Sequence, residues 1–188
     1  MRIIILFMIL LVAIIGHAWA QAVPDFTKVF TSGSLVSGSI VAPTLGSVIR
    51  IQNEDKAYKF VRNVGLITTA GDVVCYSVTN VITQTAMYEV TKPATANLNV
   101  MAGVALGAIP ATTGQGWIQI HGYNPTVNVT GDTDITLGDS LKGVNGQFYA
   151  TKDTAIGTSP TYVNHIIAAE AYATNSAATK AAFIICNW

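Results

Sequence analysis

Charged residues are scarce in this sequence. Only 11% of the 188 residues are Asp, Glu, Lys or Arg, against roughly 25% in average soluble domains. The ten acidic and ten basic residues cancel, so the chain has no long-range field to attract a nucleic acid or an anionic membrane. A weakly charged, neutral exterior tends to associate. We therefore expect much of this surface to be covered by copies of the chain or by a larger lattice.

Residues that support catalysis are equally few. His17 lies near the N-terminus, and His121 and His165 have no Cys, His or carboxylate at a metal-ligand spacing. The sequence has no Gly-x-Ser-x-Gly motif, no glycine-rich phosphate loop with Lys and Ser or Thr, and no basic run interleaved with aromatic residues. We predict a protein that is not an enzyme, with no catalytic residue, cofactor, metal or small-molecule substrate and no nucleic-acid partner.

One acidic cluster allows an alternative. Asp132, Asp134 and Asp139 lie close enough in sequence to consider Ca²⁺, a cation that prefers several oxygen ligands. Their spacing does not match an EF-hand loop. Aspartate in a Gly-Asp turn is expected for backbone hydrogen bonding alone, so we favour turns over a metal site.

Only two cysteines are present, too few for a disulfide framework. Cys75 and Cys186 each lie in an apolar run typical of a strand, which favours two buried thiols. A bridge between them stays open as an alternative if the chain is exported.

The long apolar run is confined to the N-terminus. Arg2 is followed by the uncharged apolar residues 3–15, and Ala18-Trp19-Ala20 fits the small-x-small cleavage pattern of a secretory signal peptide. The run is shorter than the ~20 residues of a transmembrane helix. We interpret residues 1–22 as a signal-peptide-like hydrophobic segment, cleaved after Ala20. A retained hydrophobic arm or anchor is the alternative.

The rest of the chain divides into an arm and a domain. Residues 23–45 are rich in Ser, Gly, Thr and Pro, too polar to form a core, and we interpret them as an extended arm that pairs with a sheet edge on a neighbour. Residues 46–188 carry short β-branched and aromatic runs between turn signals, which predict strands. The best helix candidate, 168–182, is better explained as two strands and a turn. The strand candidates are 48–51, 59–62, 72–78, 87–90, 117–121, 127–129 and 181–188.

The domain contains a weak internal repeat. Gly71-Asp72 and Gly138-Asp139 each open a strand, and an Ala-rich strand and a closing strand follow in both halves. The offset is 67 residues from Asp72 to Asp139 and 66 from Trp117 to Phe183. Two similar β units, neither able to bury its apolar face alone, predict an all-β fold, a small sandwich or barrel with an extended N-terminal arm.

These segments resemble the decoration, or cement, proteins of tailed-phage capsids. The similarity covers roughly residues 46–188 and is carried by 70–72, 102–109, 116–122, 137–141 and the Ala/Ile-rich C-terminal pair of strands. It implies a viral structural protein on the capsid exterior of a bacteriophage virion, a homotrimer that binds the major capsid protein and its own copies without chemistry. The signal-peptide-like segment 1–22 departs from the pattern of that family. The alternative is a secreted or surface-displayed β domain, such as an adhesin or filament subunit.

Candidate interface residues come from the arm and from exposed strand positions. Trp117 and His121 share one face of a strand whose other face is apolar. Core packing of Trp117 and hydrogen bonding of His121 are the alternatives to a contact between subunits. The full candidate set is Phe30, Val36, Ile40, Trp117, His121 and Trp188.

Overall fold

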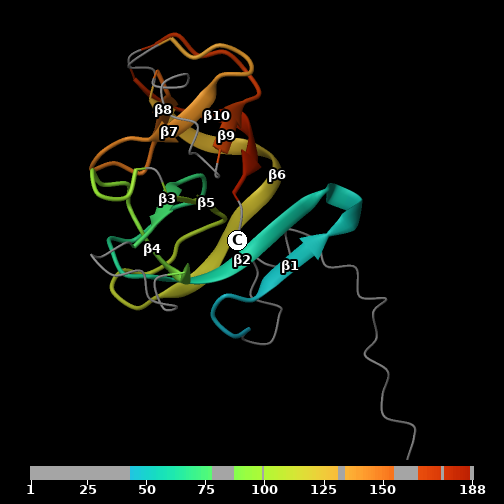
Figure 1. Ribbon diagram of the computed structural model, residues 1–188, viewed down its shortest axis with the longest axis vertical. Coiled ribbons are helices and arrows are strands. Elements are labelled where there is room, and N and C mark those ends of the chain that lie inside the picture. The colour runs from blue at the N-terminus through green and yellow to red at the C-terminus, as the bar shows by residue number, and fades with distance from the viewer. Residues whose placement is uncertain are drawn as a thin grey trace, which may run out of the picture. The chain divides into compact units, whose positions relative to one another are not determined.

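The computed structural model describes residues 43–77, 87–98, 100–130, 134–154, 165–174 and 176–186. These residues form ten strands and one short 3-10 helix, so the predicted all-β class is confirmed (Figure 1). The hydrophobic segment 1–22 and most of the predicted arm lie outside the described residues, as do Phe30, Val36, Ile40 and Trp188.

The described structure contains eleven elements. In order they are β1 (Val48–Ile51), η1 (Gln52–Glu54), β2 (Lys56–Asn63), β3 (Val73–Tyr76), β4 (Glu89–Thr91), β5 (Met101–Ala105), β6 (Gln115–Thr130), β7 (Ser140–Gly143), β8 (Ala150–Lys152), β9 (His165–Ala168) and β10 (Ala177–Ile185).

The strand pairings close into two rings of five strands. The first ring runs β2-β4-β3-β5-β6 and returns to β2, and the second runs β6-β10-β9-β7-β8 and returns to β6. The long strand β6 belongs to both rings, its first part to one and its second part to the other (Figure 1). Closure removes free sheet edges. Among the strands described, β1 alone has a single partner.

The two rings have the same topology. In each ring, the strands that come first and third along the chain pair in parallel (β2 with β4, β6 with β8). The remaining pairs are antiparallel. The repeat expected from the sequence is therefore present, with β6 serving as the last strand of the first unit and the first strand of the second.

The Gly-Asp turns at 69–72 and 136–139 are bonded alike. In each, the threonine N–H donates to the carboxylate of the aspartate three residues later, at 2.7 Å and 2.6 Å respectively. The glycine in the third position has a φ of 87° in both turns, a backbone conformation that glycine adopts without strain. These turns open β3 and β7, as the sequence predicts.

Backbone hydrogen bonds define which residues correspond between the rings. The turn glycine N–H donates to Ala105 O in the first ring and to Ala168 O in the second, both at 2.9 Å. The next residue along the chain then donates its N–H to a strand carbonyl, from Leu106 to Trp117 O in the first ring and from Ala169 to Ala181 O in the second. Ala181, rather than Phe183 as the sequence offset suggests, therefore occupies the position of Trp117. The two-residue difference keeps the same face of the strand.

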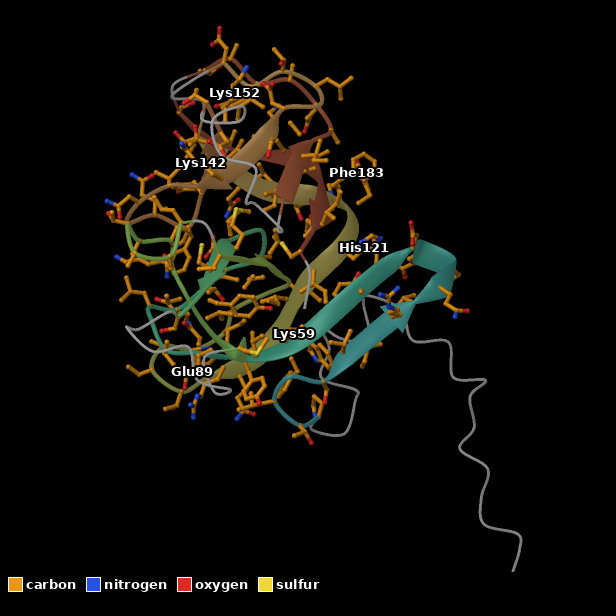
Figure 2. All side chains as sticks on the ribbon, viewed as in Figure 1. Lys59, Glu89, His121, Lys142, Lys152 and Phe183 are labelled. Carbon is orange, nitrogen blue, oxygen red and sulfur yellow. The ribbon has the colours of Figure 1, made fainter. Side chains whose placement is uncertain are left out.

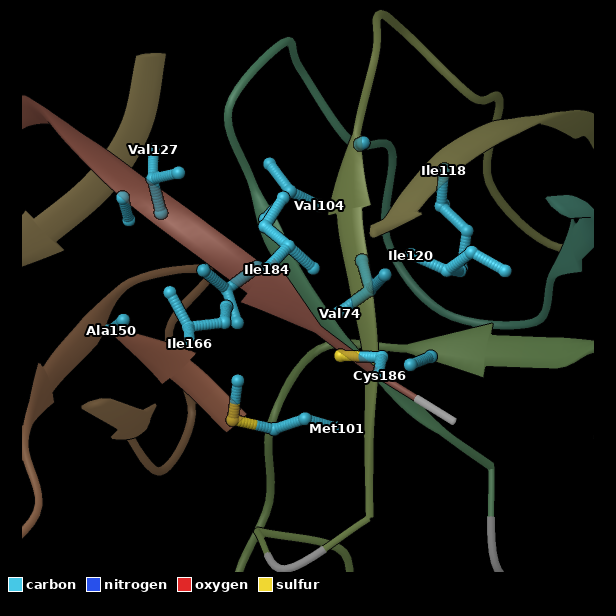
Figure 3. Close-up of a cluster of buried hydrophobic side chains, with 14 of the residues drawn as sticks. Val74, Met101, Val104, Ile118, Ile120, Val127, Ala150, Ile166, Ile184 and Cys186 are labelled. Carbon is cyan, nitrogen blue, oxygen red and sulfur yellow. The ribbon is translucent and has the colours of Figure 1, made fainter. Parts of the chain in front are cut away.

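One hydrophobic core runs through both rings. Inward-facing Val, Ile, Ala and Met residues from the first ring pack with their counterparts from the second (Figure 3). Side chains with almost no exposed surface include Val74, Val104, Ile120, Ile166 and Ile184. Because the two interiors are continuous, neither ring forms a separate core.

A second apolar cluster lies outside the first ring, and we call it the outer cluster. Tyr58, Phe60 and Trp117 form it with Ile51, and Leu45, Ile49 and Leu106 pack against it. The Phe60 and Trp117 rings are tilted, with centroids 5.1 Å apart. The segment that precedes β2 therefore covers the outward face of β2 and β6. Leu45, which the sequence assigned to the arm, packs as part of the domain.

Strand β6 is longer than the sequence suggested, because 117–121 and 127–129 belong to one continuous strand. Two strand-breaking residues lie between those segments. Gly122 has a φ of 93°. Pro125 lies at a register shift between the β10 partners of Asn124 and Val127, a bulge at which no backbone N–H is needed for the ladder.

Candidate functional site

An exposed apolar face of the described structure lies where β6 and β10 pair. Tyr123 is 43% exposed, Phe183 48% and Ile185 38%, and we call these three residues the apolar face. Tyr123 and Phe183 are cross-strand partners, and their rings meet edge to face with centroids 5.5 Å apart. Strand alternation explains the exposure, because the intervening Ile184 is fully buried in the core.

The apolar face forms one wall of a groove of about 410 Å³. Ile167 on β9 extends the apolar wall, and Gly122 lies in the lining. The turn between β1 and β2 supplies the opposite rim through Glu54 and Asp55. Figure 2 labels His121 on β6 and Phe183 on β10, both of which line the groove.

The rim of the groove is polar and places His121 beside Asp55. His121 Nε2 lies 3.8 Å from Asp55 Oδ1, and the Asp55 side chain is 95% exposed. Glu54 is paired with Lys56 at 3.2 Å. Such exposed pairs contribute about 0–1 kcal/mol to stability. An apolar centre surrounded by a polar rim is the usual composition of a protein contact surface.

A buried glutamine holds the backbone beneath the aromatic pair. Gln119 is 2% exposed, and its Nε2 donates to the carbonyl oxygens of His121, Gly122 and Tyr123 at 3.0, 3.1 and 3.2 Å. Its Oε1 accepts from Asn124 Nδ2 at 3.1 Å. These bonds satisfy carbonyl groups at the point where β6 passes between the rings. Gln119 therefore fixes the position from which Tyr123 projects.

A buried lysine lies inside the first ring. Lys59 is 5% exposed and its Nζ donates to the hydroxyl of Tyr76 at 3.0 Å, with the amine 4.9 Å from the Tyr76 ring centroid. Burial lowers the pKa of Lys59 and raises that of Tyr76. The contact satisfies a polar group in an apolar interior, which is a structural role.

Both cysteines are free, buried thiols, as the sequence favoured. Desolvation raises the pKa of Cys75 and of Cys186 to about 12, which keeps both protonated and weakly reactive near neutral pH. The disulfide alternative is therefore wrong for this structure.

The candidate interface residues fall in different places. Trp117 is 8% exposed in the outer cluster, while His121 lies on the rim of the groove. The sequence analysis missed Tyr123 and Ile185, and it treated Phe183 as part of a closing strand only. Alternation along Phe183-Ile184-Ile185 was the available signal, since it makes one face of that strand point outward.

The acidic cluster shows no metal geometry in the part that is described. Asp139 accepts from the backbone N–H and the hydroxyl of Thr136 and pairs with Lys152 at 2.9 Å, while Asp132 lies outside the described residues. No group of three His, Cys, Asp or Glu side chains in the described ranges is placed to hold a metal ion. Within those ranges there is also no helix long and apolar enough to span a bilayer.

Comparisons with known proteins return one remote structure. No family model and no curated protein matches the chain. A match among solved structures is the N base of head fiber gp8.5 in bacteriophage phi29, with a TM-score of 0.40 and 16% identity over 74% of this chain and 94% of that one. At this similarity the match assigns neither a fold family nor a function.

Proposed function

We propose that this chain is a structural protein of a phage virion, which decorates the capsid exterior by binding the major capsid protein and its own copies as a homotrimer. The observation that carries the proposal is the apolar face. A cross-strand aromatic pair that is more than 40% exposed, beside an aliphatic wall and a charged rim, is typical of a surface that a protein partner covers.

The closed rings favour contact through side chains rather than through strand addition. Most protein surfaces that associate through sheets use a free edge, and of the described strands β1 alone has a single partner. The sparse charge of the whole sequence also favours association, because few charged side chains keep copies of the chain apart. The resemblance of residues 46–188 to decoration proteins supplies the capsid as the partner.

The test is saturable attachment to particles. The full-length chain is added to particles assembled from the major capsid protein of the same virus, and bound protein is measured by co-sedimentation. We expect the Tyr123→Ser/Phe183→Ser double variant to bind at lower occupancy, and Leu137→Ser, a control at a residue that is 72% exposed elsewhere, to bind as the unmodified chain does. Absence of saturable binding by the unmodified chain contradicts the proposal.

The second candidate is a secreted or surface-displayed β domain, favoured by the signal-like residues 1–20. Export predicts a mature chain that starts at Gln21, and virion assembly without export predicts one that starts at Met1. Intact-mass measurement of the native protein distinguishes the two.

A further inference from the structure

The two rings present equivalent outward faces, and the described residues cover only one of them. Tyr58 pairs with Gln119 in the first ring, and Tyr123 pairs with Phe183 in the second. The backbone correspondence makes Phe183 the counterpart of Gln119, so Tyr123 is the counterpart of Tyr58. Yet Tyr58 is 0% exposed and Tyr123 is 43% exposed. The described part of the chain therefore leaves the second-ring equivalent of the outer cluster open.

The segment that covers the first ring has a short, recognisable sequence, Gly46-Ser47-Val48-Ile49. Gly46 has a φ of 85°, and its N–H donates to Phe60 O at 2.8 Å. Ser47 O accepts from Phe60 N–H at 2.9 Å. Ile49 then packs against the outer cluster. Glycine permits the turn onto the strand, and Ile49 then covers the face while Val48 stays 38% exposed.

The same pattern occurs twice more, immediately upstream. Residues 33–36 read Gly-Ser-Leu-Val and residues 38–41 read Gly-Ser-Ile-Val, and no charged residue lies between 31 and 42. Three copies of one covering sequence are thus available, while the first ring uses one. An uncharged aliphatic segment also suits a groove whose walls are Tyr123, Ile167, Phe183 and Ile185, because no buried charge has to be paired.

We propose that Gly38–Val41 of a second copy of this chain lies in the groove and covers the apolar face. Arms exchanged between copies then close each outward face in the way that Gly46–Ile49 closes the first ring. The inference deepens the self-association in the proposed function and concerns contact between copies only.

The connection to β1 explains why the segment comes from another copy. Val48 pairs with Lys59 and Ile51 with Lys56, so the rim residue Asp55 lies at the turn of the β1–β2 hairpin and the chain enters at the opposite end. Only residues 42–45 separate Val41 from Gly46, a span of at most about 18 Å between their Cα atoms when extended. This short connection limits how far the segment can reach within its own chain, which favours a segment from a second copy.

A disulfide cross-link between two chains tests this arrangement. Val41 corresponds to Ile49, the residue that packs on the outer cluster, so full-length Val41→Cys chains are mixed with full-length Phe183→Cys chains that carry a mass tag, and the mixture is oxidised and resolved without reductant. We expect a mixed dimer that is at least tenfold more abundant than when Leu137→Cys replaces Phe183→Cys. The native thiols at Cys75 and Cys186 are buried and stay as a common background.

Each other outcome overturns the inference. No mixed dimer, or a mixed dimer equally abundant with Leu137→Cys, means that the segment does not occupy the groove. If the Val41→Cys/Phe183→Cys double variant closes a disulfide within one chain while the mixture gives none, the arm covers its own second ring. Because purified chain alone is used, a failure here leaves capsid attachment untouched, and failed attachment with a positive cross-link leaves the arm exchange standing.

A second measurement does not depend on cysteine. The full-length Ile40→Ser/Val41→Ser variant is expected to keep its β circular dichroism and to lose self-association, seen as at least a tenfold rise in the concentration at which half the chains are assembled. Ser37→Ala/Ser39→Ala is the matched control and is expected to assemble as the unmodified chain does. A double serine variant that assembles normally overturns the proposal.

Discussion

Asp72 and Asp139 occupy the same position in the two rings, but their carboxylates have different partners. Asp72 is 6% exposed and also accepts from Asn128 Nδ2 at 2.8 Å, which ties its turn to the second part of β6. Asp139 pairs instead with Lys152 at 2.9 Å on β8 of its own ring. The first turn therefore links the two rings, and the second turn stabilises only its own.

This difference predicts unequal losses of stability. Asp72→Ala removes hydrogen bonds to a buried carboxylate and leaves Asn128 without that partner, so we expect a loss of about 2–4 kcal/mol in the free energy of unfolding. Asp139→Ala, at the equivalent exposed turn, is the control and is expected to lose about 1 kcal/mol. Urea denaturation of both variants provides the comparison, and equal losses contradict a linking role for Asp72.

Asp139 predicts a dependence of stability on acid pH. The backbone hydrogen bond from Thr136, followed by the hydrogen bond from Lys152, lowers the pKa of Asp139 below its ordinary value of 3.8. A lowered folded pKa means that the unfolded chain takes up the proton first. The stabilisation is complete above the unfolded pKa and is lost as pH falls from about 4 through the lower folded value.

The measurement is the difference in unfolding free energy between the unmodified chain and Asp139→Asn, followed from pH 6 to pH 2. We expect the difference to shrink on acidification. A difference that does not change with pH means that the carboxylate is not stabilised by its contacts in the folded state.

A side chain at position 122, in the middle of β6, would clash with the backbone of Asp55. A Cβ atom there lies 2.2 Å from Asp55 O, and the φ of 93° disfavours any L side chain. We expect Gly122→Ala to lower the unfolding free energy by more than about 3 kcal/mol. Gly138→Ala is the control, because its φ of 87° is similar but no atom lies within 4 Å, and it should lose about 1 kcal/mol. Similar losses in thermal or urea denaturation contradict the close approach.

Local patterns in the sequence predict the strands and the repeat well. Gly-Asp turns and β-branched runs depend on short-range chemistry, which the structure reproduces at 69–72 and 136–139. The continuity of β6 was not predictable from such patterns. Gly122 and Pro125 both indicate a break, and only the tertiary context, a close approach to Asp55 and a bulge opposite β10, keeps the strand intact.

The interaction surface was harder to predict for a physical reason. Alternation separates inward from outward residues but does not show what lies against the outward face. Tyr58 and Tyr123 are both outward aromatic residues on equivalent strands, and their exposures differ because Leu45, Ile49 and Ile51 cover only the first. That difference is set by packing between segments distant from Tyr123, which no local pattern encodes. Strand β8, only three residues long with a single aligned pair to β6, was missed for the same reason.

The two thiols predict slow modification in the folded state. Because burial raises the pKa of Cys75 and Cys186 to about 12, few thiolates are present at pH 8. We expect little reaction with a thiol reagent in native buffer and modification of both residues in denaturant. Rapid reaction of the native protein contradicts the burial of these side chains.

The boundary between arm and domain predicts opposite results for two truncations. Deleting residues 1–42 leaves every described residue in place, so we expect β circular dichroism and cooperative unfolding to remain while self-association is lost. Deleting residues 1–51 also removes Leu45, Ile49 and Ile51 and exposes Tyr58, Phe60 and Trp117, which pack with them. Loss of that apolar burial should lower the unfolding free energy by at least about 3 kcal/mol and shift the fluorescence of Trp117 to longer wavelength.

If the shorter deletion already abolishes the β signal, residues before Pro43 belong to the core. If the longer deletion leaves stability unchanged, the outer cluster does not stabilise the first ring.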